Sequence, residues 1–223
     1  MKDIVLLLLI VLALFGVLWL ITVSGARGLS EPGSPWDPPV IVHDIITPDE
    51  CKYIIDLATP GFSRSTVVGE NSVDSSRTSE TAWVSKNDPV AQKILAKALE
   101  LTGKGMAHCE DIQVVKYTPG TYYRAHHDSC CDASDACAEF AKDGGQRVGT
   151  LLVYLNSEFE DGETHFPDYG DLKLKANTGS AIFFRPLGSE DGKCHPKALH
   201  AGLPISSGVK YVCNVWIRED EFR

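Results

Sequence analysis

The chain has 223 residues and a formal net charge of -9, with 30 acidic against 21 basic residues. Proteins that bind nucleic acids contact phosphates through clustered lysine and arginine, so this acidic chain without a basic stripe is not expected to bind nucleic acid. The part that follows the apolar N-terminal run is long enough for one domain with its own hydrophobic core.

Residues 1–24 are predicted to form a transmembrane signal anchor. The run 4–23 is apolar apart from Thr22, and about 20 such residues match the roughly 30 Å hydrocarbon core of a bilayer. A cleaved signal peptide has a shorter apolar region of about 7–15 residues. We therefore expect an uncleaved anchor, although "SGA" at 24–26 leaves cleavage and secretion open.

The segment 25–39, "GARGLSEPGSPWDPP", contains four prolines and three glycines. This composition is typical of an extended stem that does not pack. The folded domain is accordingly expected over residues 40–223.

Seven cysteines are many for a cytosolic domain. Behind a membrane anchor they favour an oxidising compartment, which places the domain in the lumen of the endoplasmic reticulum or Golgi.

Two helices open the predicted domain. "TPDECKYIIDLA" has Thr47 as N-cap and Glu50 as the partner of a capping box. "NDPVAQKILAKALELTG" begins after the cap Asp88 and ends at Gly103.

From residue 111 the pattern changes to short β-rich runs separated by turn residues. Because the helices come first and the strands follow, the order is that of an α+β fold in which the helices back a barrel or sandwich. The runs are "IQVVKY", "RVGTLLVYLN", "LKLKAN", "SAIFFRP" and "KYVCNVWIRE".

The stretch "YRAHHDS" suggests a metal site. In an extended segment residues two apart share a face, so His126 and Asp128 point one way and His127 the other. Two histidines and one carboxylate suit non-haem Fe(II), with zinc as the rival metal. The third ligand must come from elsewhere, and the candidates are His43, His108, His165, His195 and His200.

Several spaced motifs together resemble the prolyl 4-hydroxylase family of iron and 2-oxoglutarate dioxygenases. The resemblance covers roughly residues 40 to 220. Its central motif is Y-x-x-G-x-x-Y-x-x-H-x-D from Tyr117 to Asp128. The other matching blocks are "RTSETAWV" at 77–84, "EDIQVVKY" at 110–117, "DGETHF" at 161–166 and "HAGLPISSGVKYVCNVWIRE" at 200–219.

The resemblance implies a double-stranded β-helix, or jelly-roll barrel, of two facing sheets with the N-terminal helices behind the larger one. It also implies that His126, Asp128 and His200 hold Fe(II). The remaining roles are Lys210 on the distal carboxylate of 2-oxoglutarate, with Tyr117 and Thr164 as hydrogen-bonding partners.

The resemblance further implies O₂ as cosubstrate, ascorbate as reductant and a peptide groove. A structural role is the alternative for each groove residue. The groove candidates are Arg77, Ser79, Glu110, Tyr123, Arg147 and Trp216.

The residues themselves support an inward-facing lysine in the last strand. Positions 210, 212, 214 and 216 share one face, while Tyr211, Cys213, Val215 and Ile217 form an apolar face that can pack on the helices. A buried dicarboxylate needs a cation, because an unpaired buried charge is very costly.

The predicted activity is C4 hydroxylation of peptidyl proline with release of succinate and CO₂. The alternatives are a hydroxylase of another side chain or of a small molecule, and an inactive barrel that binds proline-rich ligands. The expected partners are a proline-rich peptide or protein and, through the N-terminal helix, a membrane. The loops 61–76 and 156–171 are plausible lids over the groove.

The cluster "CCDASDAC" at 130–137 is predicted to form at least one disulfide, with Cys194 as a candidate partner. A zinc knot is less favoured, because the spacing lacks paired C-x-x-C units. Cys51 and Cys213 lie on apolar faces and are expected to be buried.

Overall fold

The computed structural model describes residues 28–31, 33–66 and 75–223. The helices in this part of the chain are α2 (Pro48–Ala58), α3 (Pro89–Thr102) and α4 (Asp135–Phe140), with short 3-10 turns η1 (Thr59–Gly61), η2 (Met106–His108) and η3 (Pro196–Ala198). The strands are β1 (Val40–Val42), β2 (Ser63–Arg64), β3 (Glu80–Val84), β4 (Ile112–Tyr117), β5 (Tyr123–His126), β6 (Arg147–Tyr154), β7 (Phe159–Asp161), β8 (Thr164–Phe166), β9 (Leu172–Leu174), β10 (Ala181–Phe184), β11 (His200–Gly202), β12 (Ile205–Gly208) and β13 (Lys210–Arg218).

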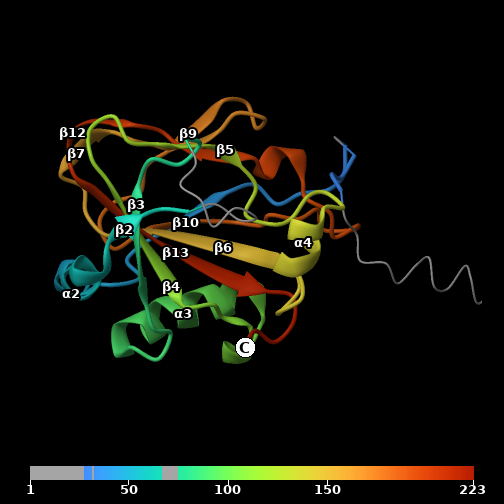
Figure 1. Ribbon diagram of the computed structural model, residues 1–223, viewed down its shortest axis with the longest axis horizontal. Coiled ribbons are helices and arrows are strands. Elements are labelled where there is room, and N and C mark those ends of the chain that lie inside the picture. Colours follow the sequence, from blue (N-terminus) through green and yellow to red (C-terminus); the bar gives the residue numbers. More distant parts are fainter. Residues whose placement is uncertain (1–27, 32, 67–74) are drawn as a thin grey trace, which may run out of the picture.

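Two antiparallel sheets form the body of the molecule. The larger has seven strands in the order β1-β10-β6-β13-β4-β3-β2, and the smaller has four in the order β5-β11-β8-β9. Helices α2 and α3 lie on one side of the large sheet, and β5 and β9 lie on the other (Figure 1). This mostly β arrangement with few helices is consistent with the expected jelly-roll.

The two long helices begin and end where the sequence predicts. Thr47 and Glu50 form the capping box of α2. Asp88 accepts hydrogen bonds from the first turn of α3, and Gly103 ends it in the left-handed conformation.

Alternation along β13 sorts the core into two layers. Cys213, Val215 and Ile217 pack with residues of α2 and α3 such as Ile54 and Ile94. The opposite face of the large sheet, including Val115, Leu152 and Val212, packs in a second cluster with Phe166 of the small sheet. The predicted apolar outer face of this strand is therefore confirmed.

Part of the segment expected to be a stem packs on the domain instead. Trp36 Nε1 donates to the Arg185 carbonyl at 2.7 Å, and its ring stacks on His195 with centroids 5.2 Å apart. The prolines around Trp36 extend the chain, but burial of a large aromatic side chain holds it against the surface.

The remaining differences between the predicted and the observed secondary structure concern short strands and one short helix. Several strands of three to five residues, such as β3, β8 and β11, were not predicted, and the cysteine-rich segment contains α4.

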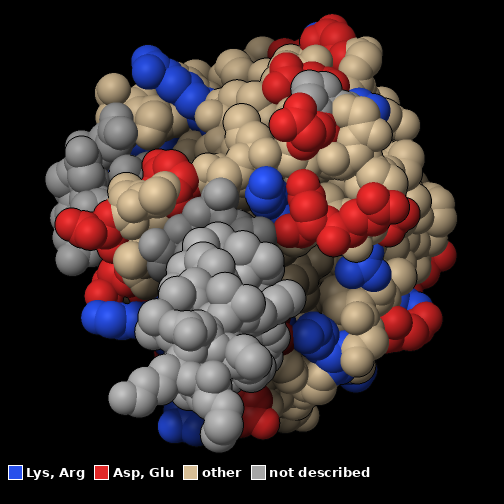
Figure 2. Space-filling model, turned by 90° about the vertical axis from the view of Figure 1, so that its right-hand side faces the viewer, with Lys and Arg blue, Asp and Glu red and all other residues tan. Residues whose placement is uncertain are grey.

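The predicted anchor at 1–24 and residues 67–74 of the first predicted lid lie outside the described residues. Among the residues that are described, no helix has the length and apolarity needed to cross a membrane. Basic and acidic side chains are interspersed over the face shown in Figure 2.

The cysteines form two disulfides, Cys130–Cys137 and Cys131–Cys194. Both involve the cluster that the sequence singled out, and the second reaches the predicted partner. Cys51, Cys109 and Cys213 are free and buried.

Peptide mapping of the unreduced chain should recover these two linkages and three thiols that alkylate only after denaturation. Burial raises the pKa of Cys51 and of Cys109 to about 11, which leaves little reactive thiolate at neutral pH. A reduced sample is the control. Recovery of seven free thiols from unreduced protein would contradict the disulfides.

Candidate active site

Two neighbouring strands of the small sheet bring the three predicted ligand residues together. His126 ends β5, Asp128 follows two residues later, and His200 begins β11, where it pairs with His126 across the strands. His126 Nε2 lies 3.7 Å from Asp128 Oδ1, and His200 Nε2 lies 3.8 Å from Asp128 Oδ2. One ligand atom from each residue falls within 4.8 Å of the others.

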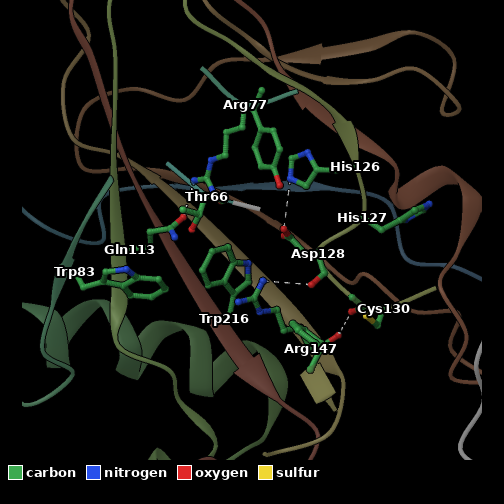
Figure 3. A pocket seen from close by; sticks show the side chains of 13 residues that line it. Thr66, Arg77, Trp83, Gln113, His126, His127, Asp128, Cys130, Arg147 and Trp216 are labelled. Atoms are coloured by element: carbon green, nitrogen blue, oxygen red, sulfur yellow. Dashed lines mark hydrogen bonds and ion pairs between the residues drawn. The ribbon is translucent and has the colours of Figure 1, made fainter. Parts of the chain in front are cut away.

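Backbone carbonyls set the orientation of both imidazoles. His126 Nδ1 is 2.8 Å from the Arg124 carbonyl, and His200 Nδ1 is 3.1 Å from the Ala198 carbonyl. Because a carbonyl only accepts, each Nδ1 carries the proton and each Nε2 turns a lone pair toward Asp128. The ring of His127 points away from Asp128, as the alternation predicts (Figure 3).

The charge state of the cluster suits a divalent cation. Burial alone would raise the pKa of Asp128, but the two imidazoles and Arg147 hold it well below its usual range. Burial lowers the pKa of His200 to about 4. Two imidazole nitrogens and one carboxylate face a common point, and this is the donor set preferred by non-haem Fe(II).

A small pocket connects this cluster to Lys210. Its lining includes Tyr117, Tyr123, His126, Thr164, His200 and Lys210. Lys210 is 1% exposed, and its Nζ lies 5.0 Å from the ring centroids of Tyr117 and Tyr154. Tyr154 OH in turn lies 2.9 Å from Thr164 Oγ1. The predicted metal ligands and the predicted cosubstrate residues thus share one cavity.

Lys210 is a buried amine without an ion-pair partner among the described residues. Its Nζ donates to the Gly162 carbonyl at 2.7 Å. Gly162 has φ +72°, and a Cβ there would lie 2.4 Å from Ile205 Cγ2, so only glycine fits this turn. Burial lowers the pKa of Lys210 to about 7. An anion in the pocket would supply the missing counter-charge.

A second pocket of about 300 Å³ lies on the outer side of the predicted metal ligands. Figure 3 shows Arg77, Trp216 and Arg147 around it, together with His126 and Asp128. The Arg147 guanidinium lies 3.5 Å from the Trp216 ring centroid, and that of Arg77 lies 4.5 Å from the Tyr123 ring. Four of the six predicted groove residues therefore line this pocket.

The other two, Glu110 and Ser79, do not line either pocket. Glu110 accepts hydrogen bonds from Arg147 Nε at 2.7 Å and from Arg218 Nε at 2.6 Å. Ser79 is fully buried, with its Oγ 3.4 Å from Arg77 Nε. Both reach the pocket only through an arginine, because the carboxylate and the hydroxyl are already occupied.

Four residues at the site were not predicted. Thr150 donates to Asp128 Oδ2 at 2.7 Å, and Gln113 accepts from Arg77 Nη2 at 2.8 Å. Tyr154 and Arg218 complete the set. Gln113 could have been found as the polar residue in "IQVVKY", and Arg218 from its place on the same face as Lys210 and Trp216.

The sequence matches the 2OG-Fe(II) oxygenase superfamily over residues 112–218. The fold and the site thus belong to an iron- and 2-oxoglutarate-dependent oxygenase.

Comparison with individual relatives narrows the assignment from the oxygenase superfamily to the prolyl 4-hydroxylases. A protein of Acanthamoeba polyphaga mimivirus assigned as a prolyl 4-hydroxylase is 42% identical over 84% of this chain and 77% of the relative. Prolyl 4-hydroxylase 1 of Arabidopsis thaliana is 33% identical over 82% and 70%.

Among solved structures, the 2-oxoglutarate complex of a viral collagen prolyl hydroxylase from Paramecium bursaria Chlorella virus-1 superposes with a TM-score of 0.64. It is 34% identical, with coverage of 82% of this chain and 96% of that one. The chain belongs to the prolyl 4-hydroxylase family.

The lowered pKa of Lys210 predicts proton uptake on cosubstrate binding. At pH 8, about one unit above this pKa of about 7, most of the free enzyme has a neutral amine. A bound carboxylate favours the ammonium form, so 2-oxoglutarate binding should take up close to one proton and weaken as the pH rises further. Calorimetry in two buffers of different ionisation enthalpy measures the uptake.

Lys210→Met should lose the uptake and bind 2-oxoglutarate roughly 10- to 200-fold more weakly, since a hydrogen bond to a charged group contributes about 1.5–3 kcal/mol. Lys173→Met, at an exposed position, is the matched control. Unchanged uptake in Lys210→Met would show that another group binds the carboxylate.

Proposed function

We propose that this enzyme hydroxylates C4 of proline residues in peptides. His126, Asp128 and His200 would hold Fe(II), and Lys210 would bind the distal carboxylate of 2-oxoglutarate. When bound, iron with O₂ and 2-oxoglutarate supplies the oxidation, in which one oxygen atom enters the proline C–H bond and the other enters succinate as CO₂ leaves. The observation that supports this proposal most directly is the unpaired buried Lys210 in the same small pocket as the ligand cluster.

The chain's own residues would bind, orient and exclude water. Lys210 neutralises the cosubstrate, and the rings of Tyr117 and Tyr154 beside it keep water from the ion pair, which strengthens it. Thr150 and the two backbone carbonyls fix the ligand side chains before any metal binds. Ascorbate as reductant rests on the family resemblance alone.

The outer pocket is suited to a peptide backbone. Trp216 is 5% exposed, and its Nε1 is one of two buried side-chain polar atoms without a hydrogen-bond partner among the described residues. The nitrogens Nε and Nη2 of Arg147 are already bound to Glu110. The indole N–H is itself buried, so the part of Trp216 that lines the pocket for a substrate is its ring.

Trp83 continues the outer pocket toward solvent. It is 54% exposed, and its ring centroid lies 6.2 Å from that of Trp216. Proline-rich chains are already extended as polyproline II, so they lose little entropy when they dock on aromatic faces. Two adjacent indoles favour a substrate with several prolines over free proline.

We also propose that the enzyme works in an oxidising compartment. The two disulfides of the domain support this placement.

Alanine in place of His126, Asp128 or His200 should each abolish turnover, because a set of three protein ligands contains no spare one. Mass spectrometry of a ten-residue proline-rich peptide after incubation with Fe(II), 2-oxoglutarate and O₂ detects the product. Near-normal turnover by any one of these variants would reject its assignment as a ligand.

Trp83→Ala should raise the KM for a proline-rich peptide about 2- to 13-fold, since a favourable aromatic contact contributes about 0.5–1.5 kcal/mol. The KM for 2-oxoglutarate should not change, because Trp83 does not line the inner pocket. Met106→Ala, on the exposed turn η2, is the control. Free proline turned over as efficiently as the peptide would contradict the groove and favour a small-molecule substrate.

A further inference from the structure

A covalent link joins the two segments that carry the proposed iron ligands. Cys131 lies three residues after Asp128, and Cys194 lies six residues before His200. Their disulfide closes a separation of 63 residues with the Cα atoms 5.4 Å apart. We refer to Cys131 and Cys194 as the staple.

The imidazole of His127 lies beside the staple. A ring nitrogen of His127 and both sulfur atoms lie within 4.8 Å of one another. His127 Nδ1 is the second of the two buried side-chain polar atoms that lack a hydrogen-bond partner among the described residues. The ring points away from the iron-ligand cluster (Figure 3), so it is not a candidate for that metal.

We propose that the reduced staple, Cys131 and Cys194, forms with His127 a second metal site that binds Zn²⁺. Zinc takes thiolate sulfur at about 2.3 Å and imidazole nitrogen at about 2.0–2.1 Å in tetrahedral geometry. Two sulfurs on one zinc then lie about 3.8 Å apart. Cα atoms that are already 5.4 Å apart permit this spacing through side-chain rotation.

The neighbouring groups leave the fourth position to water. His195 follows Cys194, but its Nε2 is 3.1 Å from the Ser34 carbonyl and its Nδ1 accepts from Lys197 N at 3.3 Å. His127 and Cys131 are only partly buried, so solvent can reach the metal. The other disulfide, Cys130–Cys137, does not belong to a metal-binding group of the described residues.

The conversion balances with a dithiol as reductant, which in an oxidising compartment is the reduced form of a thiol–disulfide exchange protein. The dithiol gives two electrons and two protons, the staple opens to two thiols, and the dithiol closes to its own disulfide. Zinc then displaces the two thiol protons, so the two thiolates neutralise its charge. The staple thus has two closed forms, a disulfide and a zinc bridge, and each keeps the Asp128 segment against the His200 segment. This inference does not depend on the proposed substrate.

Cobalt(II) is the probe, because thiolate-bound cobalt has an intense near-ultraviolet charge-transfer band that nitrogen and oxygen ligands alone do not give. The full chain is reduced with a phosphine under anaerobic conditions and titrated with Co²⁺. We expect about one thiolate-bound equivalent that Zn²⁺ displaces, and no such band in unreduced protein. Cobalt in the iron site lacks this band, since that site contains no thiolate.

Variants locate the site. The double variant Cys130→Ser with Cys137→Ser should keep the band, and Cys131→Ser with Cys194→Ser should lose it. His127→Ala leaves the disulfide able to form, yet should bind cobalt more than about tenfold more weakly. The His127→Ala variant therefore tests the metal site even if the variant without Cys131 and Cys194 does not fold.

Zinc should also protect Cys131 and Cys194, but not Cys130 and Cys137, from alkylation in the reduced protein. A reduced protein without the thiolate band, a band that survives loss of the staple, or unchanged affinity in His127→Ala would each overturn the proposal.

Discussion

The buried carboxylate of Asp128 is the constraint on which the centre of the molecule depends. An ionised carboxylate away from water is tolerated only when charges and hydrogen bonds compensate it. Here Thr150 donates to one carboxylate oxygen, and Arg147 Nη1 lies 3.3 Å from the Asp128 backbone carbonyl. A cation held between the carboxylate and the two imidazole nitrogens would compensate the remaining charge.

Arg147 connects the Asp128 segment to a buried charge network at the C-terminal end of β13. It is buried itself, and Glu110 compensates its charge with two hydrogen bonds while also binding Arg218. Removing one member of such a buried network leaves an uncompensated charge and typically costs about 3–5 kcal/mol. Glu110 therefore matters to the outer pocket without lining it, because it holds Arg147 over the Trp216 ring.

The sequence could predict what is set locally. The ends of α2 and α3 follow from caps and glycine, which act within a few residues, and the inner face of β13 follows from simple alternation. The pair His126 and Asp128 was found from spacing, but the third ligand required the family resemblance.

Pairing between distant segments could not be predicted. Strands as short as β5 and β11 carry too little pattern of their own and exist because they pair with each other, with His126 opposite His200. The same holds for Glu110, whose partners Arg147 and Arg218 are remote in sequence, and for disulfide connectivity, which the spacing of cysteines does not determine. Trp36 was assigned to an unpacked stem because its prolines dominate the local signal.

The two pockets separate two kinds of selectivity. The inner one selects by charge, because its buried amine favours an anion and its aromatic walls exclude water. The outer one is larger and selects by shape, through the aromatic faces of Tyr123, Trp83 and Trp216. Of the residues that the structure describes, only Tyr123 and His126 line both pockets. The cosubstrate and the peptide would therefore both contact Tyr123 beside the ligand cluster. A movement of the Tyr123 side chain would then change the binding of both.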